Sequence, residues 1–164
     1  MNRKRISPMP GQESVWDYPR PPRLESCSKR IRIVAGGISI VDTCESIRVL
    51  ETSHPPVYYF APSVVRTESL QEADGASFCE WKGYADYYSL QLPKRVIQRA
   101  AWSYQKPTLH FAPIAGYIAF YPGKMDACYV DEEQVVAQVG DFYGGWITRD
   151  IVGPFKGAPG TLGW

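Results

Sequence analysis

The sequence lacks an apolar run long enough for a membrane-spanning helix. Its longest strongly apolar stretch, residues 112–121, contains Pro113 and Gly116 and has half the ~20 residues that a span needs. The basic residues at positions 3–5 are not followed by an apolar segment, so we expect no secretory signal peptide. These absences predict a cytoplasmic protein that has no membrane partner.

The sequence also has no excess of charge of one sign. Its 18 Lys and Arg residues are matched by 17 Asp and Glu residues, and the formal net charge is +1. A dedicated nucleic-acid-binding domain normally shows a clear basic excess, so we expect no nucleic-acid partner. The exception is local, because residues 1–32 hold eight basic and three acidic side chains. Such an arm can contact phosphate or an acidic protein, or it can be a solvated tail.

Closely spaced metal ligands are absent as well. No C-x-x-C pair occurs, and only two histidines, His54 and His110, are available to supplement the cysteines. A structural zinc site normally needs close ligand pairs, because one turn must present two thiolates to one ion. We therefore expect no metal and no cofactor, and we expect reduced thiols at the four widely separated cysteines, Cys27, Cys44, Cys79 and Cys128.

Glycine, proline and aromatic residues are abundant. The chain has 14 Gly and 14 Pro, which disfavours long helices. It also has 11 Tyr, 6 Phe and 5 Trp, and such side chains fit half-buried pleated surfaces and the walls of pockets. Together these residues predict a β-rich domain with much irregular chain.

Period-two alternation predicts the strands. Residues 30–35 and 38–43 alternate on either side of Gly36-Gly37, which is typical of a tight hairpin. Residues 62–65 suggest a single helical turn, and residues 71–77 suggest a polar turn. We expect one compact, mainly β, antiparallel domain of the sandwich or barrel kind with little helix. Its further strands are predicted at residues 46–51, 57–60, 78–81, 84–90, 96–104, 117–121 and 127–130.

The ends of the chain differ in composition from its middle. We expect a disordered basic tail at residues 1–15, because it has no periodicity. Residues 16–29 combine Trp, Pro and Arg and suggest an extended segment, either packed on its own domain or available to a partner's proline-binding groove. Residues 30–139 form the β domain in this division. Residues 140–164 are rich in Gly and aromatics and suggest an irregular segment docked by its rings.

The predicted hairpin around Glu80-Trp81-Lys82 is one candidate site. A carboxylate, an aromatic face and an ammonium group there can act together. Lys82 can bind an anion or, if it is desolvated, act as a nucleophile or base. In the structural alternative, Lys82 is solvated and Trp81 belongs to the core.

His54 is a second candidate, because Glu51 lies three residues before it and Pro55-Pro56 follow. An imidazole beside a carboxylate can move protons near neutral pH. Alternatively, His54 simply bonds the backbone at the bend. A third candidate is a set of aromatic residues that can line a cavity or fill the sheet core. This set contains Tyr58, Tyr59, Trp102, Tyr104 and Tyr121.

Several separated motifs resemble one known family. They are Leu50–Phe60 (LETSHPPVYYF), Cys79–Gly83 (CEWKG), Ala101–Tyr104 (AWSY) and Ala119–Pro122 (AFYP). In this order they resemble the domain of unknown function 427 family, and the resemblance covers roughly residues 32–130. It implies a compact, mostly antiparallel β fold such as a β-tent. The two flanks are similar to those of the longer bacterial members.

The resemblance implies no established activity. The family also carries a nucleotidyltransferase label, but such chemistry needs clustered carboxylates for metal ions, and no D-x-D motif occurs in this chain. The best interpretation is a domain that binds a small polar or anionic molecule of unknown identity. Its pocket would use Lys82 and Glu80 together with Glu51, Trp81 and the aromatic set. The alternatives are an enzyme with His54 or Glu80 as acid or base and Lys82 stabilising negative charge, and a protein-interaction module.

Overall fold

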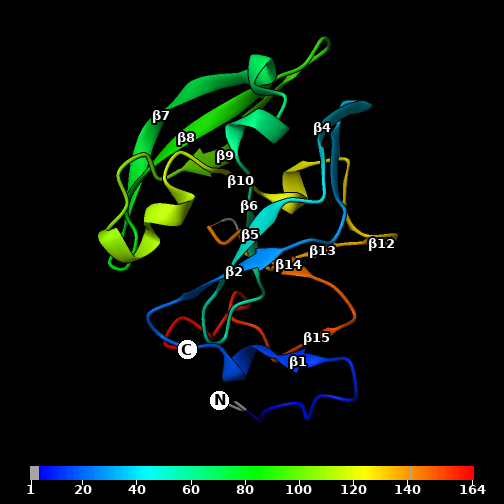
Figure 1. Cartoon of the computed structure of the whole chain (residues 1–164), viewed down its shortest axis with the longest axis vertical. Helices are drawn as coiled ribbons and strands as arrows, with labels where there is room; N and C mark the ends of the chain where they lie inside the picture. Colours follow the sequence, from blue (N-terminus) through cyan, green and yellow to red (C-terminus); the bar gives the residue numbers. More distant parts are fainter. Residues whose placement is uncertain (1–3, 141) are drawn as a thin grey trace.

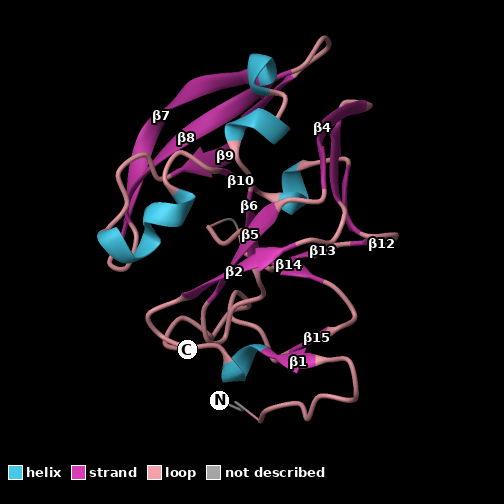
Figure 2. Ribbon diagram, in the orientation of Figure 1, coloured by secondary structure: helices cyan, strands magenta, loops and turns pink. Residues whose placement is uncertain are grey.

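The computed structural model describes residues 4–140 and 142–164 and consists mainly of short strands (Figures 1 and 2). The predicted antiparallel β fold with little helix is confirmed. In the described part of the chain, helical structure is limited to five short 3₁₀ turns, and no helix there is long and apolar enough to cross a membrane. The turns are η1 (Val15–Asp17), η2 (Pro62–Val64), η3 (Thr67–Ser69), η4 (Leu109–Ile114) and η5 (Pro122–Lys124).

One four-stranded sheet contains the hairpin that the sequence predicts most clearly. Its order is β12 (Glu133–Gln134), β11 (Ala127–Val130), β3 (Ile31–Ala35) and β4 (Ile38–Thr43). Gly36 and Gly37 connect β3 to β4 with φ angles of 57° and 74°. Only glycine adopts two such angles in succession at little cost, so the Gly-Gly pair sets the position of this turn.

A second four-stranded sheet has the order β10 (Ile118–Phe120), β9 (Val96–Ser103), β8 (Gly83–Gln91) and β7 (Leu70–Cys79). The polar turn expected at residues 71–77 is wrong, because those residues belong to β7. This strand lies at the edge of the sheet and is largely exposed, so polar side chains are tolerated on both of its faces. Its register shifts between Ala73 and Ala76, where Gly75 has a φ of 93°.

A third sheet joins the other two regions. It consists of β2 (Arg23–Cys27), β5 (Ser46–Leu50) and β6 (Val57–Tyr59), all antiparallel. Just after β6, the Phe60 amide donates to the Ile118 carbonyl at 2.9 Å, and the reverse bond measures 2.8 Å. These two bonds connect β6 to β10, so the chain on either side of β6 belongs to one continuous β framework.

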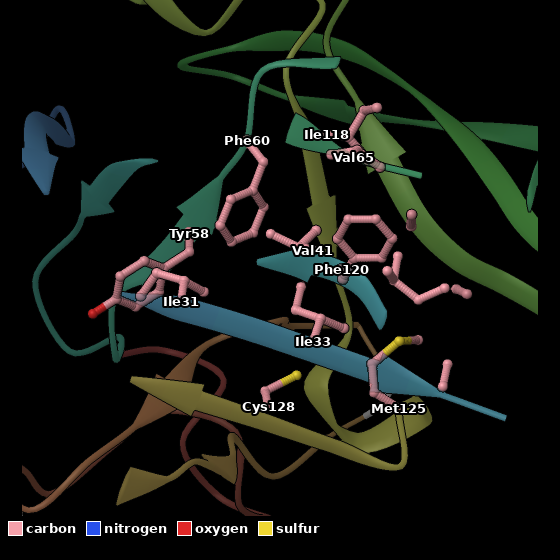
Figure 3. Close-up of a cluster of buried hydrophobic side chains, with 14 of the residues drawn as sticks. Ile31, Ile33, Val41, Tyr58, Phe60, Val65, Ile118, Phe120, Met125 and Cys128 are labelled. Carbon is pink, nitrogen blue, oxygen red and sulfur yellow. The ribbon is translucent and has the colours of Figure 1, made fainter. Parts of the chain in front are cut away.

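The main core lies between β3 and β4 on one side and the strands β6, β9 and β10 on the other (Figure 3). Ile31, Ile33, Phe60 and Phe120 are completely buried in it. Their neighbours in the chain point away from this core, because successive strand residues face opposite sides. A second cluster therefore forms on the other face, and it includes Tyr59, Trp102, Tyr104, Ala119 and Tyr121.

The two ends of the chain pack on each other at the lower end of the molecule in Figure 1. β1 (Glu13–Ser14) pairs in parallel with β15 (Ile151–Val152), and Trp16 Nε1 donates to the Pro154 carbonyl at 2.9 Å. Earlier in the carboxyl-terminal half of the chain, β13 (Val136–Ala137) pairs with β14 (Trp146–Ile147). The flanks are thus attached to the body through short strands and aromatic side chains.

The amino-terminal segment has more structure than its sequence suggests. Residues 1–3 of the expected tail lie outside the described residues. Further on, the Ile6 amide donates to the Gly153 carbonyl at 3.2 Å, and the Glu13 amide donates to the backbone carbonyl of Asp150 at 2.8 Å. These partners come from the opposite end of the chain, so local periodicity carries no sign of them.

Candidate functional site

A cavity of about 540 Å³ lies beside the second aromatic cluster, on the face of the sheet that points away from the main core. Its walls come from the chain around β6, the β7–β8 hairpin, β9, and the carboxyl-terminal segment. The lining residues are Val49, Glu51, His54, Pro55, Val57, Tyr59, Ser77, Phe78, Cys79, Glu80, Trp81, Lys82, Tyr87, Trp102, Tyr104, Tyr121, Gln138, Phe142, Tyr143, Gly144 and Lys156.

Trp102 forms the centre of the aromatic wall. Strand register places it directly between Tyr87 on β8 and Ala119 on β10. Its indole Nε1 donates to the Tyr59 hydroxyl at 3.1 Å, and its ring centroid lies 4.5 Å from that of Tyr121. Because Ala119 is small, the neighbouring rings can close around Trp102 and form a continuous apolar surface.

Most phenol groups of this wall already have hydrogen-bond partners. Tyr87 donates to Ser77 Oγ at 2.9 Å, and Tyr121 donates to the Phe142 carbonyl at 3.4 Å. Tyr104 differs, since no described residue forms a hydrogen bond with its hydroxyl although the residue is buried. Burial raises the pKa of Tyr104 well above its ordinary value, so the group stays protonated and can donate a hydrogen bond into the cavity.

Lys82 lies in the turn between β7 and β8, and only 9% of its surface is exposed. Its Nζ is 5.6 Å from the Tyr104 ring centroid and 5.8 Å from that of Phe111. Thr108 fixes the turn, because its hydroxyl donates to the Trp81 carbonyl at 2.6 Å and its amide donates to the backbone carbonyl of Lys82 at 3.2 Å. Within residues 4–140 and 142–164, no carboxylate forms an ion pair with this ammonium group.

His54 lies in the cavity wall between a carboxylate and an amide. Its Nε2 is 3.6 Å from Glu51 Oε2, and its Nδ1 is 3.4 Å from Gln138 Nε2. Because the amide nitrogen is a donor, this arrangement assigns the ring proton to Nε2, facing Glu51. Burial lowers the pKa of His54 from 6.5 to about 4, with Glu51 acting against that shift and Lys156 adding to it. The imidazole is therefore neutral at pH 7.

Glu51 is held in place from outside the cavity. Arg20 Nε donates to Glu51 Oε2 at 3.0 Å, and Arg20 also donates to the carbonyls of Thr52 and Trp164, at 3.2 and 3.0 Å. A carboxylate shared between a guanidinium group and an imidazole has little freedom to turn toward a ligand. Arg20 thus connects the amino-terminal segment to one wall of the cavity.

The structure gathers nine of the ten predicted site residues around this cavity. The exception is Tyr58, which is buried in the main core with its ring 4.8 Å from Trp146. Tyr58 and Tyr59 are consecutive residues of β6, and consecutive strand residues point to opposite faces. The two side chains therefore cannot both line the same cavity. The catalytic and ligand-binding roles of the other nine residues remain predictions.

The sequence interpretation missed the contribution of the carboxyl-terminal segment to the cavity. Gln138, Tyr143, Gly144 and Lys156 all line it. An added Cβ at Gly144 would lie 2.3 Å from Trp102 Cη2, so glycine is what allows this segment to lie against the indole. The alternation of glycine with aromatic residues after residue 140 was the available signal, but it gave no direction of packing.

No cluster suited to a metal ion accompanies these residues. Among the described side chains, no group of three or more His, Cys, Asp or Glu could hold one. Of the described residues, Lys82 and Lys156 are the cationic groups that line the cavity, and Glu51 and Glu80 are the carboxylates. Of these carboxylates, Glu51 is engaged with Arg20, while Glu80 is exposed.

A comparison with protein-family models gives one match. The model described as a domain of unknown function (DUF427) matches residues 23–131, which include β2 to β11 and all ten predicted site residues. The match omits the flanking segments that supply Arg20, Gln138 and Lys156. No curated protein matches the chain.

Proposed function

Since the chain belongs to the family of this domain of unknown function (DUF427), whose description names no activity, we propose a function from the cavity itself: it binds a small organic anion. The cavity volume of about 540 Å³ lies within the usual range for small-molecule sites, which are mostly apolar with a few placed polar groups. The aromatic wall and the buried Lys82 fit that description.

Lys82 is the single observation that carries this proposal. Placing an ammonium group in an apolar environment is costly unless an opposite charge pairs with it. Two aromatic rings compensate in part, since each such contact contributes about 0.5–1 kcal/mol or more. Among the residues that the structure describes, no carboxylate pairs with Lys82, so an anionic ligand would supply the missing partner. Tyr104 would add a hydrogen bond to the same group.

The charge state of His54 supports binding over acid–base turnover. A general base works best when its pKa lies near the working pH, whereas burial holds the pKa of His54 at about 4. The enzymatic roles of His54 and Glu80 stay predictions, as do the cytoplasmic location and the interaction role of the basic arm. A neutral imidazole nevertheless suits a wall of an anion site, because it neither repels the ligand nor adds a second buried charge.

A thermal-shift screen tests the proposal. The panel holds aliphatic and aromatic carboxylates, sugar acids, phosphate monoesters and nucleotides, each with the wild type, Lys82→Met and Lys94→Met. A ligand at a hundred times its Kd stabilises the native state by about 2.7 kcal/mol. We expect at least one anion to raise the Tm of the wild type and of Lys94→Met, whose lysine is exposed, but not of Lys82→Met. If no anion depends on Lys82, the proposal is wrong.

A further inference from the structure

Several hydrogen-bonding groups of the cavity wall are in use within the protein. Trp102 donates to Tyr59, Tyr87 donates to Ser77, and Tyr121 donates to the Phe142 carbonyl. A ligand that accepted one of these donated protons would have to displace the bond that the proton already makes, although the phenol oxygens keep lone pairs. Because a net hydrogen bond is worth only about 1 kcal/mol while an unmade buried one costs more, such an exchange brings little gain.

The polar groups beside His54 are committed in the same way. Gln138 Nε2 donates to the Lys156 carbonyl at 2.7 Å and lies 3.4 Å from His54 Nδ1, while its Oε1 accepts from the Gly145 amide at 3.1 Å. Glu51 is held by Arg20 and contacts His54. These groups form a fixed polar surface, beside which the Lys156 Nζ lies 5.5 Å from the centroid of the Tyr143 ring.

The Lys82 ammonium and the Tyr104 hydroxyl have no hydrogen-bond partner among the described residues, and both belong to largely buried residues of the wall. Lys82 Nζ lies 5.6 Å from the centroid of the Tyr104 ring, so both groups belong to one region of the cavity. Both are donors, and one carries a positive charge. A single carboxylate can accept from both, one oxygen for each.

Much of the remaining surface consists of flat rings, which lie beside the aliphatic residues Val49, Pro55 and Val57. Tyr59, Trp102, Tyr104 and Tyr121 are all buried in one cluster. Aromatic side chains pack favourably against other flat rings in offset or edge-to-face arrangements. Phe78 and Phe142 also line the cavity while each is 61% exposed, so apolar surface continues to the mouth.

We infer that the ligand is an aromatic carboxylic acid: a single negative charge bound by Lys82 and Tyr104, on a flat apolar body that lies against the aromatic wall. This inference rests on the proposed function and narrows its ligand class. A sugar acid would bring several hydroxyls to a wall rich in aromatic rings. A nucleotide would bring phosphates, for which forked arginine contacts are the strongest protein partners, and no arginine among the described residues lines the cavity.

Isothermal titration calorimetry of the full chain with matched probes tests the inference. The probes are 2-naphthoate, its neutral isostere 2-naphthamide, benzoate, cyclohexanecarboxylate, glucuronate and adenosine monophosphate. We expect 2-naphthoate to bind tightest, and benzoate to bind more tightly than cyclohexanecarboxylate. Lys82→Met should weaken 2-naphthoate by about 10- to 100-fold, the range expected for a hydrogen bond to a charged group. It should leave 2-naphthamide unchanged.

Tyr104→Phe and Lys94→Met complete the design. Tyr104→Phe keeps the ring and removes the hydroxyl, so we expect about a fivefold loss for 2-naphthoate, as a neutral donor contributes about 1 kcal/mol. Lys94→Met removes an exposed lysine and should bind like the wild type. Because Tyr104→Phe changes one atom, it remains informative even if Lys82→Met does not fold.

The outcomes separate the two levels of the argument. If glucuronate or adenosine monophosphate binds more tightly than 2-naphthoate, and Lys82→Met abolishes that binding, the inference is wrong and the proposed anion site remains. If benzoate and cyclohexanecarboxylate bind equally, recognition of a flat body is wrong. If 2-naphthamide binds as well as 2-naphthoate and no probe depends on Lys82, both the inference and the proposed function are wrong.

Discussion

His54 makes the stability of the protein depend on pH. Burial lowers its pKa from 6.5 to about 4. Above pH 6.5 the imidazole is neutral in the folded and unfolded states, so its contribution is constant. Between pH 6.5 and about 4 the unfolded chain takes up a proton that the folded protein does not, and the free energy of unfolding falls by about 3 kcal/mol as the pH is lowered. Urea unfolding at half-unit pH steps measures this slope.

The chain provides a matched control, because its only other histidine, His110, is exposed. The difference in unfolding free energy between the wild type and His54→Gln should change across the same pH range. His110→Gln is the comparison that removes an exposed imidazole. Equal slopes for the wild type and His54→Gln would show that another group, such as a carboxylate, is responsible.

Individual residues also show where sequence reasoning stops. The types and spacing at Glu80-Trp81-Lys82 and at Glu51 and His54 sufficed to select side chains that the fold gathers around one cavity. Period-two alternation also places the side chains of Tyr58 and Tyr59 on opposite faces of their strand. It does not show which of the two faces the cavity. The missing partner of Lys82 was beyond prediction, since it depends on every carboxylate that the fold places elsewhere.

At the scale of elements, the link between β13 and β14 closes one side of the cavity through Gly144. An added Cβ there would lie 2.3 Å from Trp102 Cη2 and 2.9 Å from Cζ3, so the link or the indole must move. We expect Gly144→Ala to lower the free energy of unfolding by about 1–3 kcal/mol, as overpacking does in well-packed sites. Chemical denaturation monitored by tryptophan fluorescence measures the change.

Gly163→Ala is the control for this substitution. An added Cβ at Gly163 meets no atom within 4 Å, so its effect should stay within about 0.5 kcal/mol. If Gly144→Ala is equally mild, the link moves freely and does not form a fixed wall. In that case the contact with Trp102 imposes no constraint on the shape of the cavity.

Elements with a clear pattern were predictable from the sequence, whereas edge elements were not. β3 and β4 alternate around two glycines, and the hairpin formed where expected. β7 carries Gln71, Glu72, Asp74 and Gly75, which resemble a turn because the strand has no apolar face to reveal it. Its pairing is imposed by β8, and such tertiary effects override local preference in strands.

At the scale of the whole molecule, the flanks complete the structure that the central region begins. The matched region spans residues 23–131, but Trp146 inserts from outside it into the main core, where it is 1% exposed and packs on Tyr58 and Phe60. Arg20 holds the cavity residue Glu51, again from outside. The sequence suggested docked flanks from their aromatic content, without revealing that they reach the core and the cavity.

The chain reduced to residues 23–131 should therefore fail to form a stable fold. Removing a buried tryptophan alone costs about 3–5 kcal/mol, and the total stability of a domain is about 5–15 kcal/mol. The fragment also loses β12, the antiparallel neighbour of β11. We expect a near-ultraviolet circular dichroism spectrum without sharp aromatic bands, and no cooperative thermal transition.

Two companion proteins locate the cause of that loss. Trp146→Ala in the full chain isolates the core contact and should account for about 3–5 kcal/mol of unfolding free energy. Arg5→Gln in the full chain takes away an exposed Arg5–Asp17 ion pair, and exposed pairs contribute about 0–1 kcal/mol, so that protein should melt like the wild type. A cooperative transition for residues 23–131 would instead mean that the central sheets are self-sufficient. The carboxyl-terminal flank would then serve only to shape the cavity, and Trp146→Ala should be correspondingly mild.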